Sequence, residues 1–146
     1  MQTGLDYGKA APGSVQAMDK LRKFSEGSGL ERPLIELMKT RVSQMNGCAF
    51  CIDVHTKDAS AAGETEQRLY GLSAWRETPY YSERERAALA WAEAVTNISQ
   101  INESDEEYEA ARAQFSEEEL VKLTVVVNAV NGWNRLAVAF PETAGA

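Results

Sequence analysis

The fold is most clearly indicated by ten residues, Asn46-Gly47-Cys48-Ala49-Phe50-Cys51-Ile52-Asp53-Val54-His55. They contain both cysteines and the only histidine of the 146-residue chain. If the residues after Gly47 are helical, Cys48 and Cys51 lie one turn apart, as do Cys51 and His55, so all three side chains share one face. The pattern therefore predicts a helix that presents a thiol pair beside a base. Cysteines at this spacing are within bridging range, and we expect a reversible intramolecular disulfide.

The residues before this stretch indicate another helix, so that the two form a hairpin. Pro33 suits the first turn of a helix, and Gly47 suits its end. Between them, an apolar stripe is formed by Leu34, Met38, Val42 and Met45. Cys48 then opens the second arm of the hairpin, which we expect to end at Gly63. A thioredoxin-type interpretation of the cysteine pair is disfavoured, because it requires a preceding strand.

Helical patterns account for most of the remaining chain. Further helices are expected over residues 14–26, over 65–72, after Ser82 and over 116–140. Three capping boxes support them: Ser82…Glu85, Ser104…Glu107 and Ser116…Glu119. The fold class is therefore predicted to be all-α, with one domain over residues 1–146 and its core at about 14–140. The 116–140 helix is apolar on several faces, which also predicts a homo-oligomer.

The composition excludes some classes of function. A formal charge of −7 disfavours a nucleic-acid partner, since such proteins present clustered Lys and Arg. No apolar run approaches the roughly 20 residues that span a membrane, and the first residues lack the apolar region of a secretory signal. We therefore expect a cytoplasmic protein. Ordinary thiols stay reduced there, so a close cysteine pair is typical of catalysis, redox chemistry or metal binding.

Glu36 is the only acid inside the first arm of the hairpin, and the helical rise places it at about the height of His55 on the second. It lies roughly 180° from the apolar stripe, so it either faces solvent or faces the second arm. A Glu–His–Cys relay is chemically sensible, because a carboxylate orients and charges an imidazole and an imidazolium stabilises a thiolate. The helix N-terminus favours a thiolate at Cys48, whereas the imidazole of His55 favours a thiolate at Cys51. The residues alone therefore do not decide which cysteine is the nucleophile.

Glu36 followed by Gly47-Cys48-x-x-Cys51-x-x-x-His55 resembles the core motif of the AhpD-like alkylhydroperoxidases, in the carboxymuconolactone decarboxylase superfamily. The similarity covers most of the chain after residue 20. It implies an AhpD-like helical domain that assembles as a trimer or hexamer. It also implies Cys51 as the peroxide-attacking thiol, Cys48 as the resolving thiol, and Glu36 with His55 as a proton relay. Phe50 stands where the best-known member has a second histidine between its cysteines.

The function that this resemblance implies is that of an antioxidant peroxidase. Its substrate would be a small hydroperoxide and its reductant an external dithiol, for which a lipoyl-type compound is one candidate, and no bound cofactor or metal is expected. Two alternative functions stay open: a non-catalytic redox-sensing oligomeric module, and decarboxylase-type chemistry. The cysteines could also serve as buried packing residues, or form a zinc site with His55 and Glu36.

Overall fold

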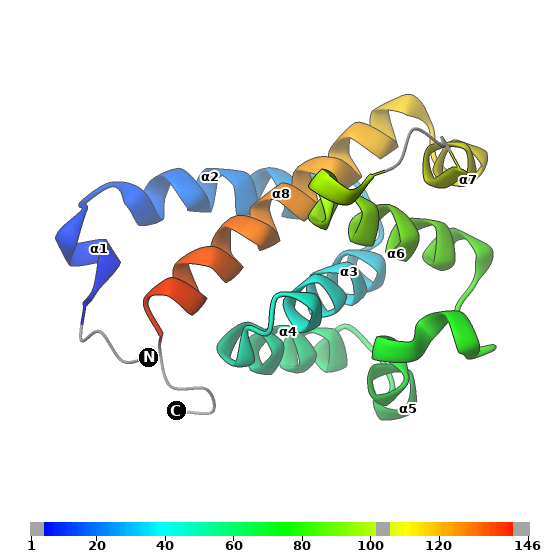
Figure 1. The fold of residues 1–146 in the computed structure, drawn as a ribbon, viewed down its shortest axis with the longest axis horizontal. Helices are drawn as coiled ribbons and strands as arrows, with labels where there is room; N and C mark the ends of the chain where they lie inside the picture. The colour runs from blue at the N-terminus through cyan, green and yellow to red at the C-terminus, as the bar shows by residue number, and fades with distance from the viewer. Residues whose placement is uncertain (1–4, 102–105, 142–146) are drawn as a thin grey trace.

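The structure is a computed structural model that describes residues 5–101 and 106–141, and within these residues all regular structure is helical (Figure 1). The elements are α1 Tyr7–Ala10, α2 Ser14–Glu26, α3 Arg32–Met45, α4 Ala49–Ala61, α5 Glu66–Tyr70, η1 Leu72–Glu77, α6 Glu83–Thr96, η2 Ile98–Gln100, α7 Glu106–Gln114 and α8 Glu117–Ala139. The all-α prediction is confirmed. Ser104, in the third expected capping box, lies outside the described residues.

Helix α3 lies at the centre of the fold, where it packs against α4, α6 and α8 (Figure 1). Three residues of its expected apolar stripe, Leu34, Met38 and Val42, lie in a core shared with α6 and α8, whereas Met45 is only partly buried. The burial continues around the helix, because Leu37 packs in a second cluster with Leu72, Trp75 and Leu89. Glu36 is therefore buried rather than solvated, and only 3% of it is exposed. The apolar stripe alone does not predict the burial of Glu36, because the stripe marks one face of α3, whereas neighbouring helices cover several of its faces.

The turn between α3 and α4 is the predicted hairpin turn, and its backbone closes it tightly. Gly47 adopts a φ of 64°, in the left-handed region that suits glycine. The N–H of Gly47 donates to the carbonyl of Gln44 (3.2 Å) and the N–H of Cys48 to that of Ser43 (3.1 Å). This pair of bonds is the Schellman arrangement that ends many helices. Helix α4 begins at Ala49, one residue later than predicted, because Cys48 caps it.

Two of the three predicted capping boxes are observed. Ser82 and Glu85 cap α6 reciprocally, and Ser116 and Glu119 cap α8. The expected helix over 65–72 is shorter, since α5 ends at Tyr70 and the chain continues as the 3₁₀ helix η1. Among the described residues, no helix has the length and apolar character needed to cross a membrane.

A short helix, α1, precedes the residues expected to form the core. The Asp6 side chain caps it by accepting from the N–H of Lys9. The Tyr7 ring lies 6.1 Å from the ring of Phe140, just after α8. The first described residues are thereby held against the end of the last helix, close to α4 and its cysteines.

Candidate active site

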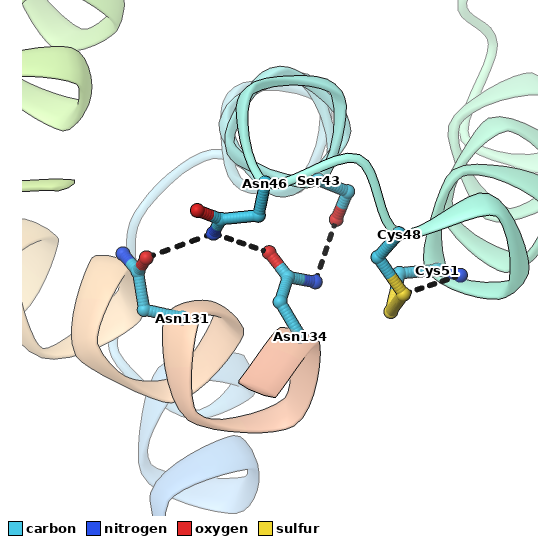
Figure 2. Close-up of a disulfide and its surroundings, with 6 residues drawn as sticks. All are labelled: Ser43, Asn46, Cys48, Cys51, Asn131 and Asn134. Carbon is cyan, nitrogen blue, oxygen red and sulfur yellow. Dashed lines mark hydrogen bonds between the residues drawn. A yellow bond between two sulfur atoms is a disulfide. The ribbon is translucent and has the colours of Figure 1, made fainter. Parts of the chain in front are cut away.

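Cys48 and Cys51 are joined by a disulfide, with their Cα atoms 5.2 Å apart (Figure 2). The expected pairing is thus present in the structure. Both residues are buried, with 2% and 5% of their surface exposed. The Cys51 N–H donates to the Cys48 sulfur at 3.2 Å, so this sulfur occupies the place of an N-cap oxygen. Both sulfurs lie in the first turn of α4, where the helix dipole favours negative charge.

A cluster of amides fixes the turn that carries the disulfide (Figure 2). Asn46 donates to the side-chain oxygens of Asn131 and Asn134, both at 2.9 Å. Asn134 in turn donates to the Ser43 hydroxyl at 3.1 Å. Asn131 also donates to Thr96 at the end of α6. The end of α3 is therefore bonded to α8, and α8 to α6, which fixes the turn that carries Cys48.

Glu36 and His55 face one another across α3 and α4, as the relay hypothesis requires. The Glu36 Oε2 atom lies 3.9 Å from Nδ1 of His55, longer than a hydrogen bond but within ion-pair range. Neither atom has a hydrogen-bond partner among the described residues, although both are buried. Lys39 lies on the other side of the carboxyl, with its Nζ 3.8 Å from Glu36 Oε1. Two buried polar atoms without partners are costly, and they mark this pair as a place where a proton or ligand can be held.

Burial disfavours charge in this cluster. Burial, reinforced by the Lys39 ammonium and opposed by Asp58, lowers the pKa of His55 to about 4. Burial raises the pKa of the Glu36 carboxyl, although Lys39 opposes the shift. Desolvation is the cause of both shifts, since it disfavours charge on both partners. This pKa favours a neutral imidazole at pH 7 in the disulfide form, whereas the imidazolium of the relay hypothesis concerns the reduced form with a Cys51 thiolate and stays a prediction.

Two cavities adjoin the disulfide, one beside each cysteine. A cavity of about 290 Å³ is lined by Tyr7, Arg22, Phe50, Cys51, Val54, His55, Trp133 and Ala137. A second, of about 190 Å³, is lined by Gly47, Cys48, Ala49, Phe50, Ala137, Val138 and Pro141. Phe50 and Ala137 belong to both and separate them. Cys51 thus shares the larger, mostly apolar cavity with His55, whereas Cys48 borders the smaller cavity.

Sequence analysis did not identify three residues of this site. Tyr7 and Trp133 line the Cys51 cavity, and the indole Nε1 of Trp133 is buried without a hydrogen-bond partner among the described residues. Asp58 places a carboxylate oxygen in a set with Glu36 and His55 whose atoms all lie within 4.8 Å of one another. Its position three residues after His55 indicates a shared helix face, so Asp58 could have been found. Tyr7 and Trp133 come from distant elements that only the tertiary fold brings there.

Several known proteins are similar to this chain in fold and in sequence over most of its length. A Bacillus subtilis protein, the uncharacterised YdfG, is 44% identical over 99% of this chain and 98% of its own length. A crystal structure from Agrobacterium tumefaciens, of a protein of unknown function proposed to be the antioxidant defence protein AhpD, has a TM-score of 0.94 at 44% identity over 99% of both chains. The debrominase Bmp8 has the same fold, with a TM-score of 0.83 at 20% identity over 94% of this chain and 74% of that one.

The family model for carboxymuconolactone decarboxylases matches residues 12–94. The matched range contains Glu36, both cysteines, His55 and Asp58, while Trp133 lies beyond it. More than half of the chain is covered, in agreement with the resemblance noted in the sequence. The chain belongs to the carboxymuconolactone decarboxylase family.

Proposed function

We propose that this protein is a cysteine-dependent peroxidase that reduces hydroperoxides through the Cys48–Cys51 pair. One observation carries the proposal: Cys51 shares an apolar cavity with His55, whose Nδ1 atom faces the buried carboxyl of Glu36. This arrangement supports the proposal, because covalent catalysis uses a nucleophile, a base and a group that orients the base. The A. tumefaciens protein with the same fold is itself proposed to serve antioxidant defence.

The first step is the attack of reduced Cys51 on the peroxide. His55 accepts the thiol proton, and the resulting thiolate attacks one peroxide oxygen. A sulfur–oxygen bond forms as the oxygen–oxygen bond breaks, and the departing alkoxide takes a proton to become an alcohol. Cys51 becomes a sulfenic acid, oxidised by two electrons. Glu36 acts through His55, since it orients the imidazole and shares its proton.

The second step regenerates the disulfide seen in the structure. The Cys48 thiol attacks the Cys51 sulfur, a disulfide forms and water leaves. An external dithiol, for which a lipoyl-type compound is our first candidate, then reduces the pair and is itself oxidised to a disulfide. The 190 Å³ cavity gives a route to the Cys48 sulfur. Attack there releases Cys51 as the leaving thiolate, beside an imidazole that can return a proton to it. A cytoplasmic location would supply the reducing conditions for this cycle.

We also propose that the chain forms a homo-oligomer, a trimer or a hexamer. Much of the apolar surface of α8 is covered within the chain, where Leu123, Val126 and Val127 are buried. Val121 and Val138 on α8 and Leu21 and Phe24 on α2 nevertheless remain exposed, at 64%, 48%, 37% and 49%. Light scattering should give three or six times the 16.1 kDa mass of one chain, and a monomer mass would refute the proposal.

Turnover of peroxide with a recycled dithiol tests the function directly. Hydrogen peroxide and organic hydroperoxides are supplied in turn with several dithiols, including dihydrolipoamide, and dithiol consumption is followed. We expect turnover by the wild type and none by Cys51→Ser. Cys48→Ser should form a trappable sulfenic acid without recycling. Oxidation of both cysteines by one equivalent of peroxide, with no turnover for any dithiol, would contradict the proposal and indicate redox sensing instead.

A further inference from the structure

The side of Glu36 and His55 away from the disulfide carries a feature that the peroxidase cycle does not use. The side-chain oxygens of Asp58, on the same face of α4 as His55, complete a set of three potential ligand atoms within 4.8 Å of one another. Asp58 is half-buried, and the Glu36 side chain is only 4% exposed. Glu36 Oε2 and His55 Nδ1 are both buried without a hydrogen-bond partner among the described residues. Two carboxylates and an imidazole thus converge on one point.

The set matches the coordination chemistry of a transition metal. Zn²⁺ accepts imidazole nitrogen and carboxylate oxygen at about 2.0–2.2 Å, and three protein ligands with water as the fourth are common. Tetrahedral bonds of that length separate ligand atoms by roughly 3.3 Å, so the 3.9 Å between Glu36 Oε2 and His55 Nδ1 must shorten slightly, and separations of up to 4.8 Å within the set by up to about 1.5 Å. The neutral imidazole is the form that binds metal. A nitrogen ligand also favours Zn²⁺ over Mg²⁺, which prefers oxygen.

We propose that Glu36, His55 and Asp58 form an inhibitory binding site for Zn²⁺ and similar divalent transition metals. The sequence suggested a different metal set, in which both cysteines took part, and Asp58 supplies the ligand that makes a cysteine-free site possible. A metal here occupies the two groups that move the Cys51 proton, so it should stop turnover while leaving the disulfide untouched. The inhibitory part rests on the proposed peroxidase function, whereas the binding part does not.

Lys39 sets the strength of the site. Its ammonium lies 3.8 Å from Glu36 Oε1 and repels a second cation. The site should therefore bind metal reversibly rather than hold it permanently, which suits an inhibitor. Lys39→Met removes the repulsion and should raise the affinity for Zn²⁺.

Calorimetric titration of the oxidised protein with ZnCl₂ tests the binding, because cysteines in a disulfide cannot bind the metal as thiolates. We expect one Zn²⁺ for each chain, an affinity at least about tenfold lower in Asp58→Asn, and tighter binding in Lys39→Met. Asp53→Asn is the matched control: it removes a carboxylate from the same helix, where Asp53 pairs with Lys57, and should leave binding unchanged. His55→Gln provides a second loss of a ligand if Asp58→Asn does not fold. Excess Mg²⁺ should not compete.

Turnover assays then test the inhibition. Zn²⁺ should inhibit wild type and Asp53→Asn equally, and Asp58→Asn should need at least about tenfold more metal for half-inhibition, with each variant compared with its own rate without metal. The proposed site is overturned if oxidised wild type does not bind Zn²⁺, or if Asp58→Asn and wild type bind it equally. Binding that depends on Asp58 in a protein without peroxidase activity would leave the site standing and refute the proposed function alone.

Discussion

Two buried polar regions flank the start of α4, and they are built on opposite principles. On one side, Asn46, Asn131, Asn134 and Ser43 bond to one another at 2.9–3.1 Å (Figure 2). On the other, Glu36 Oε2 and His55 Nδ1 face each other at 3.9 Å, without a hydrogen-bond partner among the described residues. Buried polar groups are nearly always hydrogen-bonded, so the first region follows the rule and the second departs from it.

The difference separates a structural role from a chemical one. A bonded amide cluster contributes to stability and fixes the turn of the cysteine pair. An unsatisfied carboxyl and imidazole cost stability, and such a cost is typical of sites that hold a proton or a ligand. Substitutions in the amide cluster should therefore act on folding, and substitutions in the Glu36–His55 pair should act on activity.

The largest effect is expected for His55→Gln. Turnover should fall about 10²–10⁴-fold, since the variant lacks the base that accepts the Cys51 proton. Steady-state kinetics with an organic hydroperoxide and an excess of dithiol measure the change. The free energy of unfolding at pH 7 should stay within about 0.5 kcal/mol of wild type or increase, because the neutral glutamine amide can donate to the buried Glu36 Oε2, which has no hydrogen-bond partner among the described residues. Full activity in this variant would exclude the relay.

The next largest effect is expected for Asn134→Ala, which should lower stability rather than activity. It removes the bond accepted from Asn46 and the bond donated to Ser43, so we expect a loss of about 2–4 kcal/mol in the free energy of unfolding. Urea titration measures it. Asn128→Ala is the matched control, because it makes the same change at an exposed position of α8 and should cost less than about 0.5 kcal/mol. Equal losses in the two variants would contradict a structural amide cluster.

Stability should also depend on pH through His55. The folded pKa of about 4 lies below the ordinary 6.5, so the unfolded chain binds a proton first as the pH falls. Stability is therefore full above pH 6.5 and declines toward pH 4, by up to about 3 kcal/mol from this residue. Glu36 acts in the opposite sense, since its raised pKa removes stability as the pH rises through the folded value. Unfolding of wild type and His55→Gln at several pH values isolates the histidine. Parallel curves between pH 4 and 6.5 would show that His55 is not buried as a neutral group.

The smallest effect is expected for Glu36→Gln. The side chain keeps its size and still faces the imidazole, so turnover should fall only about tenfold, less than in His55→Gln. Stability should be unchanged or slightly higher, because a buried ionisable carboxyl is replaced by a neutral amide. Rates and unfolding curves of both variants, measured side by side, test the order. A greater loss of activity in Glu36→Gln than in His55→Gln would place the essential proton on the carboxyl.

The sequence predicted those features that depend on local patterns. The helix over 14–26, the capping boxes of Ser82 and Ser116 and the hairpin turn at Gly47 all rest on residues close in the chain, and the structure confirms them. Helical rise placed Glu36 at the height of His55 but left open whether it faces solvent or the second arm. Burial that several helices create together decides between the two, and it also lowers the pKa of His55.

Other parts of the site could not be found in this way. Trp133 reaches the Cys51 cavity from α8 and Tyr7 from α1, and no spacing rule connects these elements with α4. The amide cluster likewise joins residues 85 and 88 positions apart, so its bonds follow only from the packing of α3 on α8. Long-range contacts of this kind are decided by the whole core.

The reactivity of Cys51 tests most directly whether the Glu36–His55 pair serves the cysteine. Cys48→Ser provides a suitable background, because serine can also cap α4 and Cys51 is then the only thiol. Iodoacetamide alkylation of reduced protein is followed from pH 5 to 10 with and without His55→Gln. We expect fast alkylation near pH 7 that slows markedly in His55→Gln, with the apparent pKa of Cys51 moving toward ~8.5. Identical rate profiles in the two proteins would show that His55 does not activate Cys51, and would contradict the proposed mechanism.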